Sequence, residues 1–260
     1  MIYGLVFIIG LLIGSFLNVV ILRYNSGDSL VRGGSRCFSC GKGLKWHELV
    51  PVFSFLAQKG KCRGCKAKIS WQYPAIELLT AFLFLTSFQL LKFNSNSWEF
   101  GFVLPGYWLV ISLLIVIAVY DLRHMIIPNG IVWSLNAIGF LSLLRFSPFG
   151  FEIPSFLSGI LFFGFFALLW TVSKGKWMGF GDAKLALGLG WLLGPQATFH
   201  AFLYSFWIGA MVGIALLVLD RIRKKKKYSM KSQIPFGPFL IIGALLAFLL
   251  EINVLDFCAF

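Results

Sequence analysis

Long apolar stretches, separated by short polar segments, make up most of this chain. The first stretch covers residues 2–22, and a polar, basic loop follows from Arg23 to about Pro74. A helix needs about 20 apolar residues to cross a bilayer, or somewhat fewer where it is tilted. The pattern therefore predicts eight transmembrane helices, at residues 2–22, 75–91, 102–120, 130–144, 154–172, 183–193, 197–219 and 234–250.

The composition agrees with an all-α polytopic membrane protein. Hydrophobic residues make up 58% of the 260 residues, and the mean hydropathy of +0.84 is higher than a soluble domain of this size needs. The N-terminal stretch lacks a basic segment and a small-residue cleavage site, so we expect a retained helix and not a signal peptide. The net charge of +13 is expected to face anionic lipid, with no nucleic acid as a partner.

Basic residues are concentrated on one side of the predicted topology. If the loop at 23–74 faces the cytoplasm, eight crossings also place residues 121–129, 173–184 and 220–233 there. These four segments hold 21 of the 23 Lys and Arg residues, which is the asymmetry that the positive-inside rule describes. The basic run at 223–227 is most simply an anchor that faces lipid headgroups. The same topology places Asp121 and Asp182 at the cytoplasmic face.

Two cysteine pairs in the first loop have the spacing of a zinc ribbon. Each pair is a Cys-x-x-Cys segment, and 21 residues separate the two pairs. Four thiolates suffice for a closed tetrahedral zinc site, which is structural because it leaves no open position for catalysis. Two disulfides or four free thiols are the alternatives, and a cytoplasmic location argues against disulfides. The candidate ligands are Cys37, Cys40, Cys62 and Cys65.

Two of the ten acidic residues lie at the ends of predicted transmembrane helices on one membrane face. Asp121 follows one apolar stretch, and Asp182 lies on a glycine-rich turn between two others. Carboxylates at membrane depth are costly and point to function. Two carboxylates that share a proton can supply a base and an acid for peptide hydrolysis. A helix cap or an interfacial charge is the alternative for either aspartate alone. Glycines beside Asp182, at Gly179 and Gly181, would let an extended peptide approach.

Six motifs, in order along nearly the whole chain, resemble those of bacterial prepilin peptidases, the type IV leader peptidases. They are the segment Gly14-Ser15-Phe16-Leu17-Asn18; the two cysteine pairs; the end of the loop, from Ile69 to Glu77; Asp121 with Ile127-Pro128-Asn129; Gly179-Phe180-Gly181-Asp182-Ala183-Lys184; and Ile234-Pro235-Phe236-Gly237-Pro238.

The resemblance implies two activities. One is cleavage of the basic leader of type IV prepilins or pseudopilins at the cytoplasmic face of the bacterial inner membrane, by an Asp121–Asp182 dyad of the GxGD class. The other is N-methylation of the new N-terminal residue with S-adenosylmethionine. The resemblance also implies three segments. Residues 1–22 form a first helix, residues 23–74 form a zinc loop linked to methylation, and residues 75–260 form the protease domain. Glu48, Gly60 and Glu77 are candidates for methylation, and Pro128, Gly179, Gly181, Lys184, Pro235 and Gly237 support the protease motifs.

Two other functions remain compatible with these residues. One is a GxGD membrane protease without methyltransferase activity, which the cysteine loop argues against. The other is a non-enzymatic zinc-ribbon membrane protein or a transporter, for which substitution of either aspartate would leave function intact. Loss of leader removal in Asp121→Asn and Asp182→Asn variants would exclude the non-enzymatic alternative.

Overall fold

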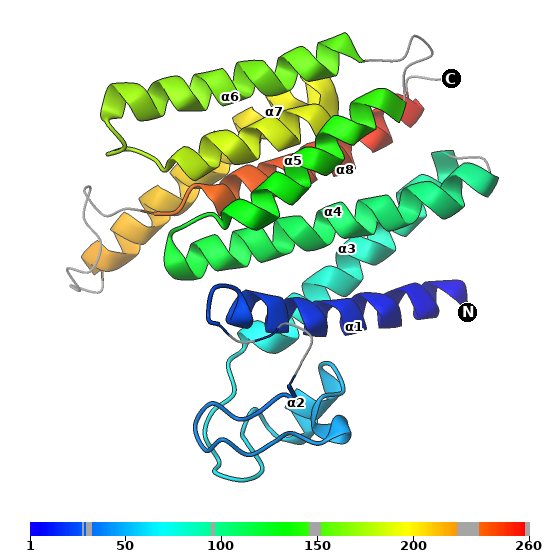
Figure 1. The fold of residues 1–260 in the computed structure, drawn as a ribbon, viewed down its shortest axis with the longest axis vertical. Helices are drawn as coiled ribbons and strands as arrows, with labels where there is room; N and C mark the ends of the chain where they lie inside the picture. The colour runs from blue at the N-terminus through cyan, green and yellow to red at the C-terminus, as the bar shows by residue number, and fades with distance from the viewer. Residues whose placement is uncertain (28, 30–32, 95–96, 146–151, 223–233, 258–260) are drawn as a thin grey trace. The chain divides into compact units, whose positions relative to one another are not determined.

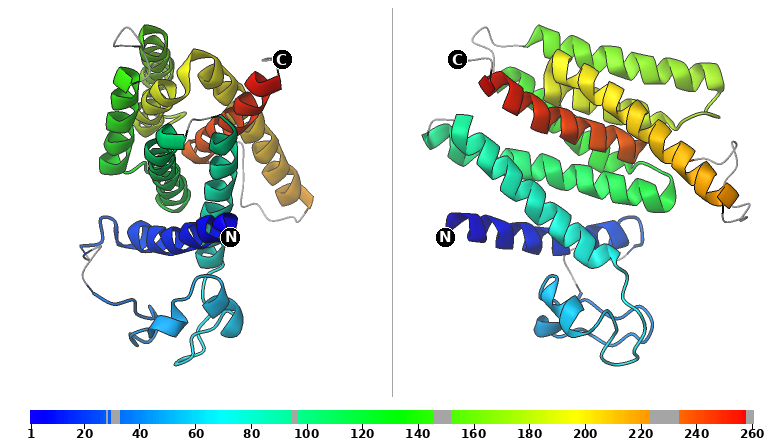
Figure 2. Two further views of the ribbon diagram at one scale, coloured as in Figure 1. Left: turned by 90° about the vertical axis from the view of Figure 1, so that its right-hand side faces the viewer. Right: turned by 180° about the vertical axis from the view of Figure 1, so that it is seen from behind.

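The computed structural model describes residues 1–27, 29, 33–94, 97–145, 152–222 and 234–257, and this part of the chain is helical apart from its loops. The chain divides into two compact units, residues 1–116 and 117–260. Figures 1 and 2 show their helices as ribbons. Asp28, Cys258 and the basic run at 223–227 lie outside the described residues. The predicted all-α membrane fold is confirmed.

The first unit is built on a pair of helices that the cysteine loop connects. Helix α1 (Ile2–Arg23) packs against α3 (Gln72–Asn94), and α4 (Ser97–His124) follows. Two small residues allow the close approach of α1 and α3, since a Cβ on Gly10 would lie 2.5 Å from Ala81 Cα, and one on Gly14 would lie 2.7 Å from Glu77 Cα. The pair therefore holds both ends of the loop.

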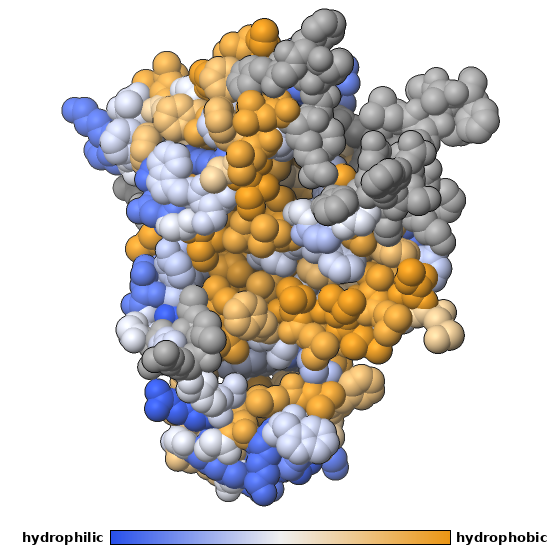
Figure 3. All heavy atoms as spheres, turned by 45° about the vertical axis from the view of Figure 1, so that its right-hand side comes forward, coloured by the Kyte–Doolittle hydropathy of each residue, from blue (hydrophilic) through white to orange (hydrophobic). Residues whose placement is uncertain are grey.

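The loop has little regular structure. It contains a short 3-10 helix, η1 (Trp46–Glu48), and a single-turn helix, α2 (Phe53–Ala57). Two isolated antiparallel bridges, Arg36 with Gly43 and Lys61 with Lys68, each close a tight turn that carries one cysteine pair. Figure 3 shows apolar side chains gathered over the helices, and hydrophilic side chains with a few apolar patches on the loop.

Helix α7 (Phe180–Ile222) is central in the second unit and contacts α5 (Asn129–Arg145), α6 (Ile153–Ser173) and α8 (Gly237–Phe257). It is interrupted at Gly194, where φ is 75° and ψ is 175°, and Pro195 follows. The chain reverses direction at this point, so that the two halves of α7 run in opposite directions (Figures 1 and 2). The first half packs closely on α6, because a Cβ on Gly190 would lie 2.5 Å from Gly159 Cα.

The helices match the predicted transmembrane segments, but several boundaries differ. Helix α4 runs to His124, so Asp121 lies inside it and not after it. Five of the helices are long and apolar enough to cross a membrane, and α5 and α8 are shorter apolar helices. The predicted helices at 183–193 and 197–219 are the two halves of α7. However, α7 begins at Phe180, so Asp182 lies in its first turn and not on a preceding loop. Helix α8 begins at Gly237 and not at Ile234, with Pro238 in its first turn, where a missing backbone amide costs no helical hydrogen bond.

Candidate active site and cysteine cluster

Asp121 lies in the last turn of α4 and is buried, with 4% of its surface exposed. The helix ends just beyond it. The Met125 amide donates a hydrogen bond of 2.8 Å to the Asp121 carbonyl, and Met125 itself adopts a left-handed conformation with φ of 54°. The chain then turns through Ile127 and Pro128 into α5, whose first turn is closed by the bond from the Val132 amide to the Pro128 carbonyl, at 3.1 Å. This reversal keeps Asp121 next to the start of α5.

Asp182 is buried to the same degree, with 5% exposed, in the first turn of α7. Its amide donates to the Gly179 carbonyl at 3.2 Å, which closes that first turn. The amide of Gly179 in turn donates to the Asp182 carboxylate, and the amide of Gly237 donates to the Asp121 carboxylate. The carboxylates of Asp121 and Asp182 are close enough to interact electrostatically. The two carboxylates therefore lie in one region of the second unit, where helix ends of α4, α7 and α8 meet.

Ile127 packs between the segments that carry these carboxylates. A Cβ on Gly181 would lie 2.8 Å from Ile127 Cβ, and a Cβ on Gly237 would lie 3.2 Å from Ile127 Cδ1. Only glycine fits at these two positions without movement of a neighbour. Gly179 differs, because the nearest atom to its Cβ position is 3.9 Å away. We expected both glycines of the motif to leave room for a peptide. At Gly181 that room is filled by Ile127, so this glycine has a packing role.

Lys184 connects the two motifs that carry the aspartates. Its Nζ donates to Asn129 Oδ1 at 3.0 Å and lies 5.3 Å from the ring centroid of Phe180. Because Asn129 is the first residue of α5, the bond ties the start of α7 to the turn after Asp121. The sequence analysis identified Asn129 only as part of the motif that accompanies Asp121. Its Oδ1 partner, 55 residues away, could not be found from local sequence.

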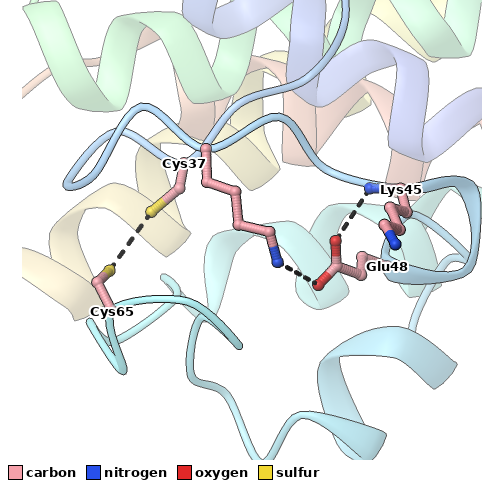
Figure 4. Close-up of polar contacts among 5 residues, drawn as sticks. Cys37, Lys45, Glu48 and Cys65 are labelled. Atoms are coloured by element: carbon pink, nitrogen blue, oxygen red, sulfur yellow. Dashed lines mark hydrogen bonds and ion pairs between the residues drawn. The ribbon is translucent and has the colours of Figure 1, made fainter.

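The four predicted metal ligands come together in the first unit. The sulfurs of Cys37, Cys40, Cys62 and Cys65 all lie within 4.8 Å of one another, and the thiols are free. The Cys37 and Cys65 sulfurs are 3.8 Å apart (Figure 4). Zn–S bonds of about 2.3 Å in a tetrahedron give sulfur–sulfur distances of about 3.8 Å. The cluster could therefore hold a zinc ion.

The turn around Cys37 favours its thiolate. Backbone amides of Cys40 and Ser39 donate hydrogen bonds to the Cys37 sulfur and lower the pKa of this thiol to about 6. A thiolate is the form that binds a metal, so the backbone of the knuckle prepares the first ligand before any ion arrives.

Glu48, a candidate for methylation, is held within the loop. Its carboxylate accepts a bond of 2.9 Å from the Lys45 amide and forms an ion pair of 3.6 Å with Lys42 Nζ, as Figure 4 shows. The Lys45 bond and the Lys42 charge lower the pKa of Glu48. These contacts fix the turn that follows the first cysteine pair.

The two other candidates for methylation also have contacts that shape the loop. Glu77 lies in the second turn of α3, and its Oε2 accepts a bond of 2.7 Å from the Val52 amide. Gly60 adopts φ of 66°, and a Cβ there would lie 3.1 Å from the Phe55 ring. The contacts favour anchoring and turn-forming roles for these residues, and their part in methylation stays a prediction.

Known protein families match both halves of the chain. A model of the bacterial peptidase A24 N-terminal domain matches residues 8–91, and a model of the type IV leader peptidase family matches residues 108–214. The first match contains all four cysteines of the cluster, and the second contains Asp121 and Asp182. No solved structure matches the chain significantly.

Curated relatives match over nearly their whole length. A protein named prepilin leader peptidase/N-methyltransferase from Bacillus subtilis is 35% identical over 257 residues, which cover 98% of this chain and 96% of the relative. Proteins of the same name from Aeromonas salmonicida and Pseudomonas aeruginosa are 32% and 31% identical, and cover 95% and 93% of this chain and 90% and 88% of their own. The chain therefore belongs to the type IV leader peptidase family.

Proposed function

We propose that this protein cleaves the leader peptide of type IV prepilins or pseudopilins with Asp121 and Asp182, and then N-methylates the new N-terminus. The family supports both activities. The observation that carries the proposed dyad is the burial of both carboxylates in one region of the second unit, each with a backbone amide as donor.

The chemistry follows from two carboxyl groups that share one proton. The ionised group removes a proton from a water molecule, whose oxygen attacks the carbonyl carbon of the scissile peptide bond. The protonated group donates its proton to the carbonyl oxygen. Collapse of the tetrahedral intermediate then breaks the C–N bond, and the leaving amine takes a proton from the dyad. The amides of Gly179 and Gly237 hold the carboxylates in place during these transfers.

Orientation follows from the distribution of charge. With 21 of 23 basic residues on the loop side, the positive-inside rule supports an inner-membrane protein whose aspartates and cysteine loop face the cytoplasm. A prepilin leader is a basic segment joined to an apolar helix, so its cleavage site lies at the same membrane face.

Two cofactors are part of the proposal. The cysteine cluster would hold a structural zinc ion through four thiolates, and metal binding would then contribute to folding of a loop that has a small apolar core. S-adenosylmethionine would supply the methyl group. Glu48 and Glu77 already accept hydrogen bonds from backbone amides of the loop, so they would support the methylating loop by holding its shape.

Co-expression with a prepilin tests the proposal. Asp121→Asn and Asp182→Asn should each abolish leader removal, while Glu152→Gln should leave it unchanged. Glu152 is a suitable control because it is an acid of the same unit that accepts a bond from Ser155 at the start of α6. Normal leader removal by either aspartate variant would overturn the proposed dyad.

A further inference from the structure

The loop carries an apolar strip on its exposed surface. The strip consists of five side chains in and between η1 and α2 that are between 37% and 79% exposed: Trp46, Leu49, Val50, Phe53 and Leu56. The only charged side chain within the strip is Glu48, which is buried and paired with Lys42. A row of large apolar side chains on a cytosolic zinc ribbon would be costly in water, so the strip needs a surface to cover it.

The contacts of Glu77 fix the position of this strip along α1 and α3. Its carboxylate holds the Val52 amide at 2.7 Å, and the Ser15 side chain of α1 donates to the same carboxylate. Ser15 lies eight residues before Arg23, the last residue of α1. At a rise of 1.5 Å per residue, the contact is about 12 Å inside the end of α1. Glu77 lies about 8 Å from the start of α3 by the same measure.

Val52 is therefore beside the transmembrane helices and not beyond their ends. Val52 itself has φ of 61°, an unfavourable conformation for a β-branched residue, and the Glu77 bond holds it there. Phe53 and Leu56, which follow this turn, are 68% and 61% exposed.

We infer that this strip enters the interface of the bilayer, where it contacts headgroups and the upper acyl chains. A depth of about 5–10 Å is typical of interfacial amphipathic segments. The flanking residues fit this position. Trp71 is 73% exposed and directly precedes α3, as interfacial tryptophans do, and its ring centroid lies 4.8 Å from that of Phe55 with the rings tilted by 59°. Lysines border the strip on both sides, at Lys45 and Lys59, where they can reach anionic headgroups.

The inference goes beyond the proposed cleavage and methylation, and it gives the loop a fixed place. A metal-bound loop that floated in the cytoplasm would sample many positions. A loop held by the Glu77 bond and by lipid would stay at the height where an apolar prepilin helix leaves the membrane. The lipid contact would hold even if the aspartates had another role.

Photo-crosslinking of the full chain in phosphatidylethanolamine–phosphatidylglycerol vesicles tests the contact. Photoreactive benzoylphenylalanine is placed at Phe53 or Leu56. Leu12, 55% exposed on α1, is the lipid-facing reference, and Phe38, 79% exposed in the first cysteine knuckle, is the matched loop position outside the strip. Zinc content and leader cleavage report whether each variant is folded.

Phospholipid adducts at Phe53 and Leu56, at yields near that of Leu12 and several-fold above Phe38, are the expected result. Two outcomes would overturn the inference. In one, Leu12 gives lipid adducts while both strip positions give none or react with protein. In the other, Phe38 reacts with lipid as strongly as Phe53, which would mean that exposure alone explains the adducts.

Discussion

The Oδ2 atom of Asp121 lies 2.6 Å from the position that a Cβ on Gly237 would occupy. The side chain of alanine therefore cannot be added at this position without displacement of the carboxylate or of α8. The last motif of the chain, 116 residues after Asp121, thus acts directly on the geometry of the first aspartate. It does so through the absence of a side chain and through the Gly237 amide.

Gly237→Ala should lower the rate of leader cleavage by about 10²-fold, since a displacement of about 1 Å at a reacting group has an effect of that size. Gly164→Ala, on α6 of the same unit, is the matched control, because no described atom lies within 4 Å of the Cβ position there. Cleavage rates of purified variants in detergent measure the difference. Equal rates for the two variants would show that the packing at Gly237 does not position Asp121.

Lys184→Met should slow cleavage by breaking the 3.0 Å bond to Asn129, while Lys184→Arg should retain much of the activity because it can still donate to Asn129 Oδ1. The loss should appear in kcat more than in KM, because the bond orients helix ends and does not contact the leader in this account. An increase in KM at constant kcat for Lys184→Met would instead assign the lysine to substrate binding.

Gly188 and Asn136 form a tight contact between α7 and α5. A Cβ on Gly188 would overlap the Asn136 side chain, and the amide of Asn136, 2% exposed, has no hydrogen-bond partner among the described residues. Gly188→Ala should lower the free energy of unfolding by about 1–3 kcal/mol through overpacking.

The double variant Gly188→Ala/Asn136→Ala should recover most of that loss. It removes the overlapping amide, and a buried polar group without a partner contributes little when it is deleted. Thermal unfolding in micelles measures both variants. A double variant less stable than Gly188→Ala would mean that the Asn136 amide stabilises the helix pair.

Cys62→Ser should remove zinc from the protein, because Cys62 is the most buried of the four ligands, at 4% exposed. The wild type should contain one zinc ion per chain, and Cys258→Ser, a substitution outside the cluster, should retain it. Methylation should be lost in Cys62→Ser before leader cleavage is, since the loop and the aspartates belong to different units. A metal-free wild-type protein would contradict the zinc assignment.

Hydropathy predicted most of this fold, because a helix that crosses a bilayer needs about 20 apolar residues in a row, which the sequence shows directly. Local sequence also indicated the four cysteines, whose spacing is itself the signal. Helix boundaries near the aspartates were less predictable. The start of α7 at Phe180 depends on how Gly181 packs against Ile127, and the pairing of Lys184 with Asn129 depends on the turn after Asp121.

Long-range contacts of the loop were outside the reach of sequence patterns. Glu77 was selected as a methylation residue, yet its carboxylate bonds to the amide of Val52, 25 residues earlier. Nothing in the local sequence marks Val52 for a left-handed conformation, which a β-branched residue adopts only when its surroundings hold it there. The apolar strip could be located only because that bond places the turn before α2 next to α3.

A double-mutant comparison of cleavage tests the central claim most directly. Leader cleavage is measured in proteoliposomes for the wild type, Asp121→Asn, Asp182→Asn and the double variant. Two carboxyls that share a proton act as one unit, so each single variant should lose about 10²–10⁴-fold or more, and the double variant should be no slower than the worse single variant. A single variant with near-normal cleavage, or single losses that multiply in the double variant, would contradict a shared-proton dyad of Asp121 and Asp182.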